Sequence, residues 1–363
     1  MAFYNLFPPF DFLKIPAFGL EISDRSFKYA RLKRDKNGIR LDKFGAKEIP
    51  KDLIIAGEIK EKDSLASFLK DSFKNSGIKY VISSLPEERA FLRIVELPQM
   101  DAKNIRTSIE AQLEEYIPLA AKDAIFDFEI LNGLRKGNIM DVVVVAFPRA
   151  LIDSYKEVLI RAGLKPLIFE LESWALARGL SRENDSTTKM IVDFGRTRIS
   201  FAIVNGNKVQ FTSTIKVSGD DLDKAIARSF SVSADEAERI KKIQGLRQTG
   251  DYPEVYSVIL PTISAIKEEI KKYFSYWQSH YTHIHSQKED FAVKEILLCG
   301  GEANLLGLAE YLSYELSVPV KKANVWLNIT SFDNYVPEIE FSDSLVYSTV
   351  LGLALKGLKL GLV

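Results

Sequence analysis

Phe18–Leu32 reads FGLEISDRSFKYARL, and Met190–Val204 reads MIVDFGRTRISFAIV. Both are apolar runs in which an acid, Glu21 or Asp193, comes just before a short turn, and both continue through an Asn-Gly pair into a further strand pattern. The two acids are 172 residues apart (193 − 21), nearly half of the 363-residue chain. A pattern repeated at this distance predicts two related lobes.

Each strand pair is followed along the chain by a helix and a buried strand. In the first half, residues 61–77 carry apolar side chains at helical spacing, and residues 78–86 form an apolar run typical of a buried strand. In the second half, residues 257–281 predict a long amphipathic helix, and residues 294–301 predict a buried strand that ends in two glycines. The halves therefore repeat a whole plan of strands and helix.

Residues from about 95 to 165 fit neither copy, and we expect them to form a small inserted α+β unit. One predicted helix carries four side chains on one face: Ile105, Ile109, Leu113 and Tyr116. A central strand is predicted at residues 141–147, and a second helix at residues 150–163, where Gly163 ends it.

Composition excludes several classes of protein. Lys plus Arg and Asp plus Glu each total 49, so the chain lacks the basic excess typical of nucleic-acid binding, and no nucleic-acid partner is expected. Its single cysteine, Cys299, permits neither an intrachain disulfide nor a thiolate zinc site. The longest purely apolar run, Val142–Phe147, is far too short to span a membrane, so we expect a cytoplasmic protein without direct membrane insertion.

The two turns have a chemistry of their own. A tight turn of small residues points consecutive backbone N–H groups at an anion, which suits a phosphate. A carboxylate at the strand end can hold hydrated Mg²⁺, because this ion takes few protein oxygens and keeps several waters. Two such turns facing each other, one after Glu21 and one after Asp193, would clamp the phosphates of one nucleotide.

Five segments in the same order resemble the actin-like ATPase superfamily, and within it the PilM family of type IV pilus assembly proteins, relatives of the cell-division protein FtsA. They are FGLEISDRSFK, IVDFGRTRIS, GDDLDKAIARSFSVSADEAERIKK, EILLCGGEANLLGLAEYLSYELSVPV and SDSLVYSTVLGLALKGL. The resemblance covers nearly the whole chain except about the first 15 residues. It implies an α/β protein of the actin-like ATPase fold, with two duplicated ribonuclease-H-like lobes and a small α+β subdomain inserted in the first.

The resemblance also implies domain boundaries. The first lobe is expected at residues 15–95, 165–190 and 342–363, the inserted partner-binding subdomain at 96–164, the second lobe at 191–218 and 292–341, and its helical subdomain at 219–291.

The implied cofactors are ATP and Mg²⁺. Glu21 and Asp193 match the acids beside the metal and the phosphates. The residues that match cofactor-binding positions are Ser23, Asp24, Arg25, Ser26 and Lys28 in the first lobe, and Gly195, Arg196, Thr197, Gly219, Glu238, Lys241, Gly300 and Gly301 in the second. Glu172 matches the acid that orients the attacking water in some relatives, although Ser173 replaces the proline that follows it there.

Several positions depart from the family pattern. Ser23 replaces a glycine, Asp24 brings a negative charge toward the phosphates, and Arg196 and Arg198 replace small residues. The arginines either compensate for that charge or fill the site and mark a degenerate ATPase, so we expect nucleotide binding with at most slow turnover.

Some of these residues also have purely structural interpretations. Glu21 and Asp193 could cap local backbone N–H groups. Glu238 and Lys241 could form an ordinary surface ion pair on a helix. Gly300 and Gly301 could form a plain turn.

The resemblance implies a role as a cytoplasmic adaptor of the pilus machinery. Its partner would be the cytoplasmic N-terminal peptide of a PilN-type inner-membrane protein, which carries an Ile-Asn-Leu-Leu-Pro-like stretch and would recruit the chain to the inner face of the membrane. The resemblance implies that this peptide binds in a groove between the inserted subdomain and the first lobe. Because Tyr4–Pro8 reads YNLFP, the chain's own N-terminal segment could compete for that groove, in its own molecule or in a second copy. The alternatives are an FtsA-like cell-division membrane tether and a small-molecule kinase of the same superfold.

Overall fold

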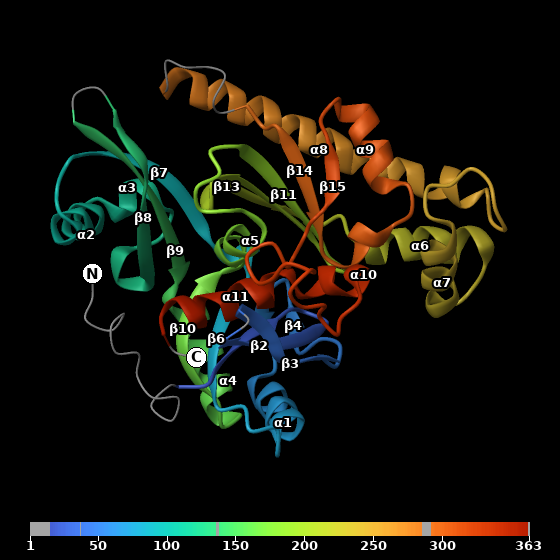
Figure 1. Cartoon of the computed structure of the whole chain (residues 1–363), viewed down its shortest axis with the longest axis horizontal. Coiled ribbons are helices and arrows are strands. Elements are labelled where there is room, and N and C mark those ends of the chain that lie inside the picture. Colours follow the sequence, from blue (N-terminus) through green and yellow to red (C-terminus); the bar gives the residue numbers. More distant parts are fainter. Residues whose placement is uncertain (1–14, 37, 136–137, 285–291, 362–363) are drawn as a thin grey trace.

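Two five-stranded sheets with the same strand order form the two lobes of the molecule (Figure 1). The structure, a computed structural model, describes residues 15–36, 38–135, 138–284 and 292–361. The first sheet has the order β3-β2-β1-β6-β10 and the second the order β13-β12-β11-β14-β15. The strands of the first are β1 (Ala17–Ile22), β2 (Ser26–Asp35), β3 (Gly38–Glu48), β6 (Tyr80–Leu85) and β10 (Lys165–Leu171), and those of the second are β11 (Thr188–Phe194), β12 (Ile199–Asn205), β13 (Lys208–Ile215), β14 (Glu295–Cys299) and β15 (Val320–Lys322). The predicted duplication is confirmed.

The pairing within each sheet is also repeated. β1 runs antiparallel to β2 and parallel to β6, and β11 runs antiparallel to β12 and parallel to β14. Glu21 is paired with Lys28 on β2, and Asp193 is paired with Ser200 on β12. Both pairs hold equivalent positions in the two sheets, so the strand-end acids predicted from the repeat are structurally equivalent.

Two helices lie between the lobes, and two more cover the first sheet's other face. α5 (Glu172–Leu180) and α11 (Ser348–Lys359) lie in the middle of Figure 1, where Ala175 and Leu353 contact the first sheet and Leu176 and Leu351 join the second-lobe core. α1 (Lys62–Phe73) and α4 (Arg149–Arg161) share a buried apolar cluster with β1, β2 and β6.

The second lobe carries its own helices. α8 (Val255–Ile284) packs a row of isoleucines into the core formed by β11, β12 and β14, and α6 (Gly219–Phe230) and α7 (Ala234–Gln244) pack on each other beside it. α9 (Leu308–Leu316) precedes β15, and the short α10 (Phe341–Ser344) leads toward α11. The helix predicted at residues 257–281 is thus confirmed within α8.

The inserted unit has a separate core. It contains β7 (Phe91–Pro98), α2 (Ala102–Ala111), α3 (Leu113–Tyr116), β8 (Ala124–Arg135) and β9 (Ile139–Pro148), with sheet order β7-β9-β8. The single helix predicted here is broken at Gln112, whose φ of −116° ends α2 before α3 begins. We refer to residues 91–148 as the small subdomain, because the helix that follows, α4, packs its apolar face into the first-lobe core.

The first lobe also contains a small two-stranded ribbon and a short 3₁₀ turn. β4 (Ile54–Ile55) and β5 (Glu58–Ile59) form a two-stranded ribbon, and the 3₁₀ turn η3 (Glu87–Arg89) joins β6 to β7. The competing segment Tyr4–Pro8 lies outside the described residues. Nowhere in the part of the chain that the structure describes is there a helix long and apolar enough to cross a membrane.

α5 and α11 approach so closely that one crossing point admits no side chain. A Cβ atom added to Gly352 of α11 would lie 1.9 Å from the carbonyl oxygen of Ala175 in α5. Gly179, also in α5, faces Gly352 with more room, since its added Cβ would meet atoms no nearer than 3.6 Å.

Gly352→Ala should therefore push the two helices apart. We expect the free energy of unfolding to fall by about 3 kcal/mol, the upper part of the usual range for overpacking. Gly179→Ala is the matched control and should change it by less than about 1 kcal/mol, because alanine fits there and favours the helix. Urea unfolding followed by circular dichroism measures both, and equal stabilities for the two variants would contradict the close contact.

Candidate functional site

A cavity of about 840 Å³ lies between the lobes, where the turns after β1 and β11 meet. It lies within the usual size range of sites for small ligands. Most of the residues predicted from the sequence line it: Glu21, Ser23, Arg25, Ser26, Lys28, Glu172, Asp193, Gly195, Arg196, Thr197, Glu238, Lys241, Gly300 and Gly301. Asp24 and Gly219 are not among its lining residues.

The two turns have the same hydrogen bond in equivalent places. The N–H of Ser23 donates to the carbonyl of Ser26 at 2.9 Å, and the N–H of Gly195 donates to the carbonyl of Arg198 at 3.0 Å. The Ser23 hydroxyl also donates to that Ser26 carbonyl at 2.9 Å, so serine closes the first turn with its side chain. The replacement of glycine by Ser23 is therefore compatible with a tight turn.

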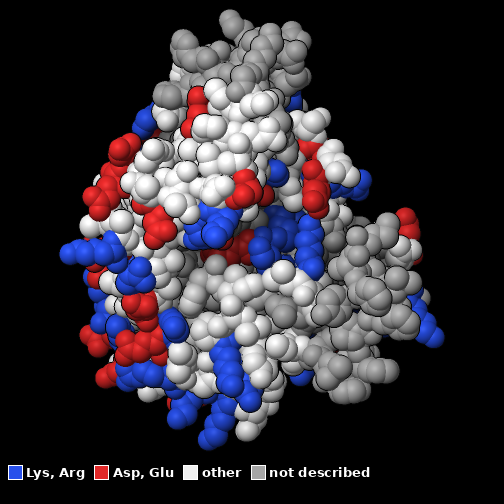
Figure 2. Space-filling view, turned by 90° about the vertical axis from the view of Figure 1, so that its left-hand side faces the viewer, with Lys and Arg blue, Asp and Glu red and all other residues white. Residues whose placement is uncertain are grey.

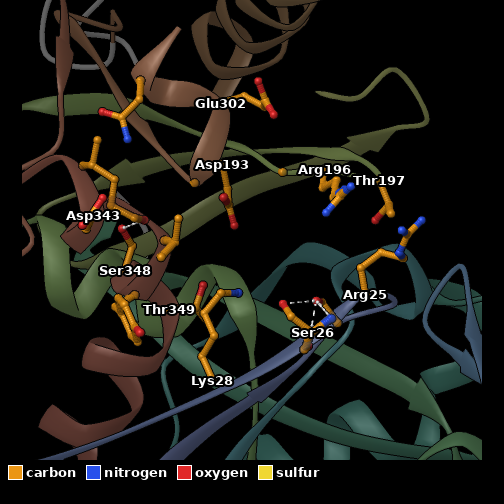
Figure 3. Close-up of a pocket in the computed structure, with 18 of the residues that line it drawn as sticks. Arg25, Ser26, Lys28, Asp193, Arg196, Thr197, Glu302, Asp343, Ser348 and Thr349 are labelled. Atoms are coloured by element: carbon orange, nitrogen blue, oxygen red, sulfur yellow. Dashed lines mark hydrogen bonds between the residues drawn. The ribbon is translucent and has the colours of Figure 1, made fainter. Parts of the chain in front are cut away.

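Lys28 and the two strand-end acids converge in the cavity. Figure 3 shows Lys28 rising from the first lobe and Asp193 pointing down from the second. The Lys28 ammonium bonds Oε1 of Glu21 at 2.7 Å. Burial opposes protonation of Lys28, but Glu21 outweighs it and raises the pKa of the ammonium. Burial, followed by the charges of Glu21 and Glu172, raises the pKa of Asp193 to about 7.

Glu21 and Asp193 suit Mg²⁺, which keeps several water ligands, better than a metal ion whose ligands all come from the protein. Oε2 of Glu21 is buried and has no hydrogen-bond partner among the described residues. Among the described residues, no three or more His, Cys, Asp or Glu side chains lie together in a way that could hold a metal ion. A magnesium ion commonly binds through one or two carboxylates, phosphate oxygens and water, and Glu21 and Asp193 fit that pattern.

Asp24 points away from the phosphate side of the turn. Its two carboxylate oxygens accept hydrogen bonds from the backbone N–H groups of Ala56 at 2.8 Å and Gly57 at 2.9 Å. These residues have positive φ angles of 48° and 72° and join β4 to β5. The charge that seemed unfavourable for phosphate is thus used to hold a neighbouring loop.

Arg25 and Arg196 meet at the rim of the cavity, one from each lobe (Figure 3). Arg25 lies 3.5 Å from Asp220, and Nε of Arg196 donates to the same carboxylate at 3.0 Å. Arg196 also lies 3.4 Å from Glu48 of the first lobe. The rim therefore carries ion pairs that cross from lobe to lobe.

Arg198 faces inward and is largely buried. One of its terminal nitrogens donates to both oxygens of Glu172, at 2.9 and 3.0 Å, and its Nε lies 3.1 Å from Oε2 of Glu88. Glu172 also accepts a hydrogen bond from the N–H of Glu87 at 3.3 Å. The acid expected to orient water is therefore held by an arginine at the edge of the cavity.

Glu87 and Glu88 were missed by the sequence analysis. Burial, followed by the charge of Glu172, raises the pKa of Glu87 to about 8, and burial raises that of Glu88 to about 7 although Arg198 opposes the shift. The paired acids after a buried strand, in LPEER, are the only sequence signal, and such a pair normally indicates an exposed turn.

Lys241 is buried and belongs to an ion-pair group. Its ammonium lies 2.9 Å from Asp223 and 2.8 Å from Glu302, whereas Glu238 pairs with Lys242 at 2.7 Å. Asp223 and Glu302 were not predicted from the sequence, because they come from α6 and from the turn after β14, which only the fold brings to α7. Other lining residues that sequence reasoning missed are Ser200, Asn304, Asp343, Tyr347, Ser348 and Thr349.

The two sheets of equal topology, with a cleft between them and helices crossing behind it, define an actin-like ATPase fold. A family model described as type IV pilus assembly protein PilM matches residues 19–358. The chain belongs to this family.

Solved structures agree on the fold. A PilM-PilN type IV pilus biogenesis complex is 24% identical over 96% of this chain and 99% of that chain, with a TM-score of 0.78. MreB5 of Spiroplasma citri bound to ADP is 14% identical over 96% and 97%, with a TM-score of 0.59. The ethanolamine utilization protein EutJ from Carboxydothermus hydrogenoformans is 17% identical over 93% and 88%, with a TM-score of 0.53.

The raised pKa of Glu87 predicts a pH-dependent stability. An unfolded chain releases this proton near pH 4.5, whereas the folded protein keeps it up to about pH 8. Since the folded state binds more protons between these values, its stability should fall as the pH rises through this window, by at most about 1.4 kcal/mol per pH unit for one proton.

Glu87→Gln removes the carboxyl group that takes up this proton, and it should make the free energy of unfolding less dependent on pH between 5 and 8. Urea unfolding at several pH values measures the slope. Glu110→Gln, at an exposed position of α2, is the control and should keep the wild-type slope. Identical slopes for Glu87→Gln and the wild type would contradict the buried protonated carboxyl.

Proposed function

We propose that the chain binds Mg²⁺ and ATP in the cleft and serves as a nucleotide-dependent adaptor in type IV pilus assembly. The observation that carries the proposal is the meeting of Lys28, Glu21 and Asp193 between two turns with the same hydrogen bond. In this view Asp193 and Glu21 hold Mg²⁺, directly or through water, and Lys28 together with turn N–H groups binds phosphate oxygens. Gly300 and Gly301 would border the adenosine.

The arrangement of Glu172 favours binding over fast hydrolysis. Its carboxylate accepts three hydrogen bonds, two from Arg198 and one from Glu87, before any water is considered. A general base or water-orienting acid works best with a free oxygen directed at the reacting water. ATP therefore acts chiefly as a ligand that sets the relative position of the lobes, and any hydrolysis is slow.

The partner that we propose is the N-terminal peptide of a PilN-type inner-membrane protein. Family membership and the fold likeness to a PilM-PilN complex support this choice. The peptide would bind between the small subdomain and the first lobe and would recruit a cytoplasmic protein to the inner face of the membrane. The family match favours this role over the FtsA-like tether and over a small-molecule kinase.

Charged side chains of both signs lie on the side of the molecule that carries the small subdomain. Figure 2 shows the side on which the small subdomain lies in Figure 1, with basic side chains around a hollow that contains acidic ones. Glu129 of β8 lies near Lys208 of β13 and Lys356 of α11. Since both signs of charge are present, a peptide with polar as well as apolar groups suits this region better than a purely apolar segment.

Lys28→Met tests the nucleotide site. We expect the affinity for Mg²⁺ and ATP to fall at least roughly tenfold, because the variant removes the phosphate-facing cation and leaves Glu21 to repel the anion. Isothermal titration calorimetry measures the affinity. Lys33→Met, at an exposed position on the same strand, is the control and should bind as the wild type does. Absence of binding to the wild type at millimolar nucleotide would overturn the proposal.

Deleting residues 1–14 tests the competing N-terminal segment. If YNLFP occupies the peptide groove, its removal should strengthen binding of a fluorescent peptide that contains Ile-Asn-Leu-Leu-Pro. Fluorescence polarisation measures the two affinities. A chain with Tyr4 and Phe7 changed to serine should behave like the deletion, whereas equal peptide affinities for all three proteins would exclude self-competition.

A further inference from the structure

Arg198 belongs to the cleft and to the buried junction behind it. Its carbonyl closes the second turn, and the residue is among those that line the cavity. The guanidinium group nevertheless pairs with Glu172, at the start of α5, and with Glu88, in η3. A movement of the Arg198 side chain would therefore change contacts both in the cleft and at the junction of α5 and η3.

η3 is the direct entry to the small subdomain, because β7 begins two residues after it ends. Hydrogen bonds in both directions fix the turn to α5. The carboxyl group of Glu87 accepts from the N–H and hydroxyl of Ser173, at 3.0 and 3.2 Å, and Glu172 accepts from the N–H of Glu87. β13 of the second lobe packs against both η3 and β7, and Lys208 at its start donates to the carbonyl of Ile130 in β8 at 2.6 Å. The second lobe thus contacts the small subdomain through this junction.

Arg198 is the cation that pairs with Glu88. Only 15% of each side chain is exposed, so water screens the pair weakly. If the guanidinium group turned toward a phosphate in the cavity, the contact between Arg198 of the second lobe and Glu88 of η3 would be lost, whether Glu88 stays charged or takes up a proton, and the turn would lose one of the contacts that hold it.

We propose that Arg198 couples the nucleotide cleft to the small subdomain, by exchanging its ion pair with Glu88 for one with a nucleotide phosphate and so releasing η3 and β7. The coupling rests on the proposed function, because it requires nucleotide in the cleft. It identifies the side chain that links the two sites and the element that changes state.

Glu88→Gln tests the coupling without altering the lining of the cavity. Hydrogen exchange of the backbone amides of residues 87–95 is measured with and without Mg²⁺ and AMPPNP at saturation, alongside peptide affinity under both conditions. In the wild type we expect nucleotide to speed exchange in this segment severalfold and to change peptide affinity about tenfold. In Glu88→Gln both values should be nearly independent of nucleotide, because the ion pair is already absent.

Lys267→Gln is the matched control. Lys267 is also a largely buried cation that contacts two carboxylates, those of Glu268 and Glu315, but it joins α8 to α9 within the second lobe. This variant should show the wild-type response to nucleotide. Arg198→Lys, which keeps the charge but cannot span both carboxylates at once, should show a reduced response.

The outcomes separate the two proposals. A wild type that binds no nucleotide overturns the proposed function. A wild type that binds nucleotide while exchange in residues 87–95 stays the same overturns the coupling alone. A Glu88→Gln variant that binds nucleotide and responds as the wild type does also overturns the coupling.

Discussion

The contact between α5 and α11 is the constraint on which the cleft depends. The two helices touch where Gly352 meets the Ala175 carbonyl, and each of them contacts both lobes. Their first residues, Glu172 and Ser348, both line the cavity. Because a helix pair packed this closely transmits displacement, a change in the angle between the lobes must move groups at the base of the cleft. The fold thus makes lobe position and site geometry inseparable.

The duplication supplies one backbone twice and different chemistry each time. Lys28 and Ser200 are equivalent in the two sheets, as are Ser26 and Arg198 in the two turns, each pair being 172 residues apart. The first copy therefore places its cation among the strand-end acids, whereas the second places its cation against Glu88 and Glu172 behind the cleft. Equal turns allow the two lobes to face one anion, and the unequal side chains give the second lobe its connection to η3.

Strand pattern, turn residues and strand-end acids are local signals repeated along the chain, and they were sufficient to predict the two related lobes and the facing turns. The actin-like fold and most of the other lining residues were predicted from the resemblance to the PilM family. The sequence was insufficient to predict the partners of the charged groups. Asp24 bonds a loop 32 residues away, and Glu88 and Arg198 are 110 positions apart (198 − 88), so no local pattern indicates either contact. For the same reason the spacing of Glu238 and Lys241 alone allowed a surface ion pair beside the predicted cofactor-binding role, although Lys241 is buried with Asp223 and Glu302 as its partners. Long-range ion pairs depend on the packing of lobes, which spacing alone does not encode.

The charge balance of the cavity explains why nucleotide would act as a conformational ligand. Its lining includes seven basic and eight acidic residues, and six of the basic ones already form ion pairs with acids. A polyphosphate that binds here must compete with those acids for the cations, so part of its binding free energy is spent on breaking existing pairs. Several of the pairs, including Arg25 with Asp220 and Arg196 with Glu48, connect the lobes. A ligand that binds by replacing contacts between lobes necessarily changes how the lobes are held together, and this makes the cleft suited to switching even where hydrolysis is slow.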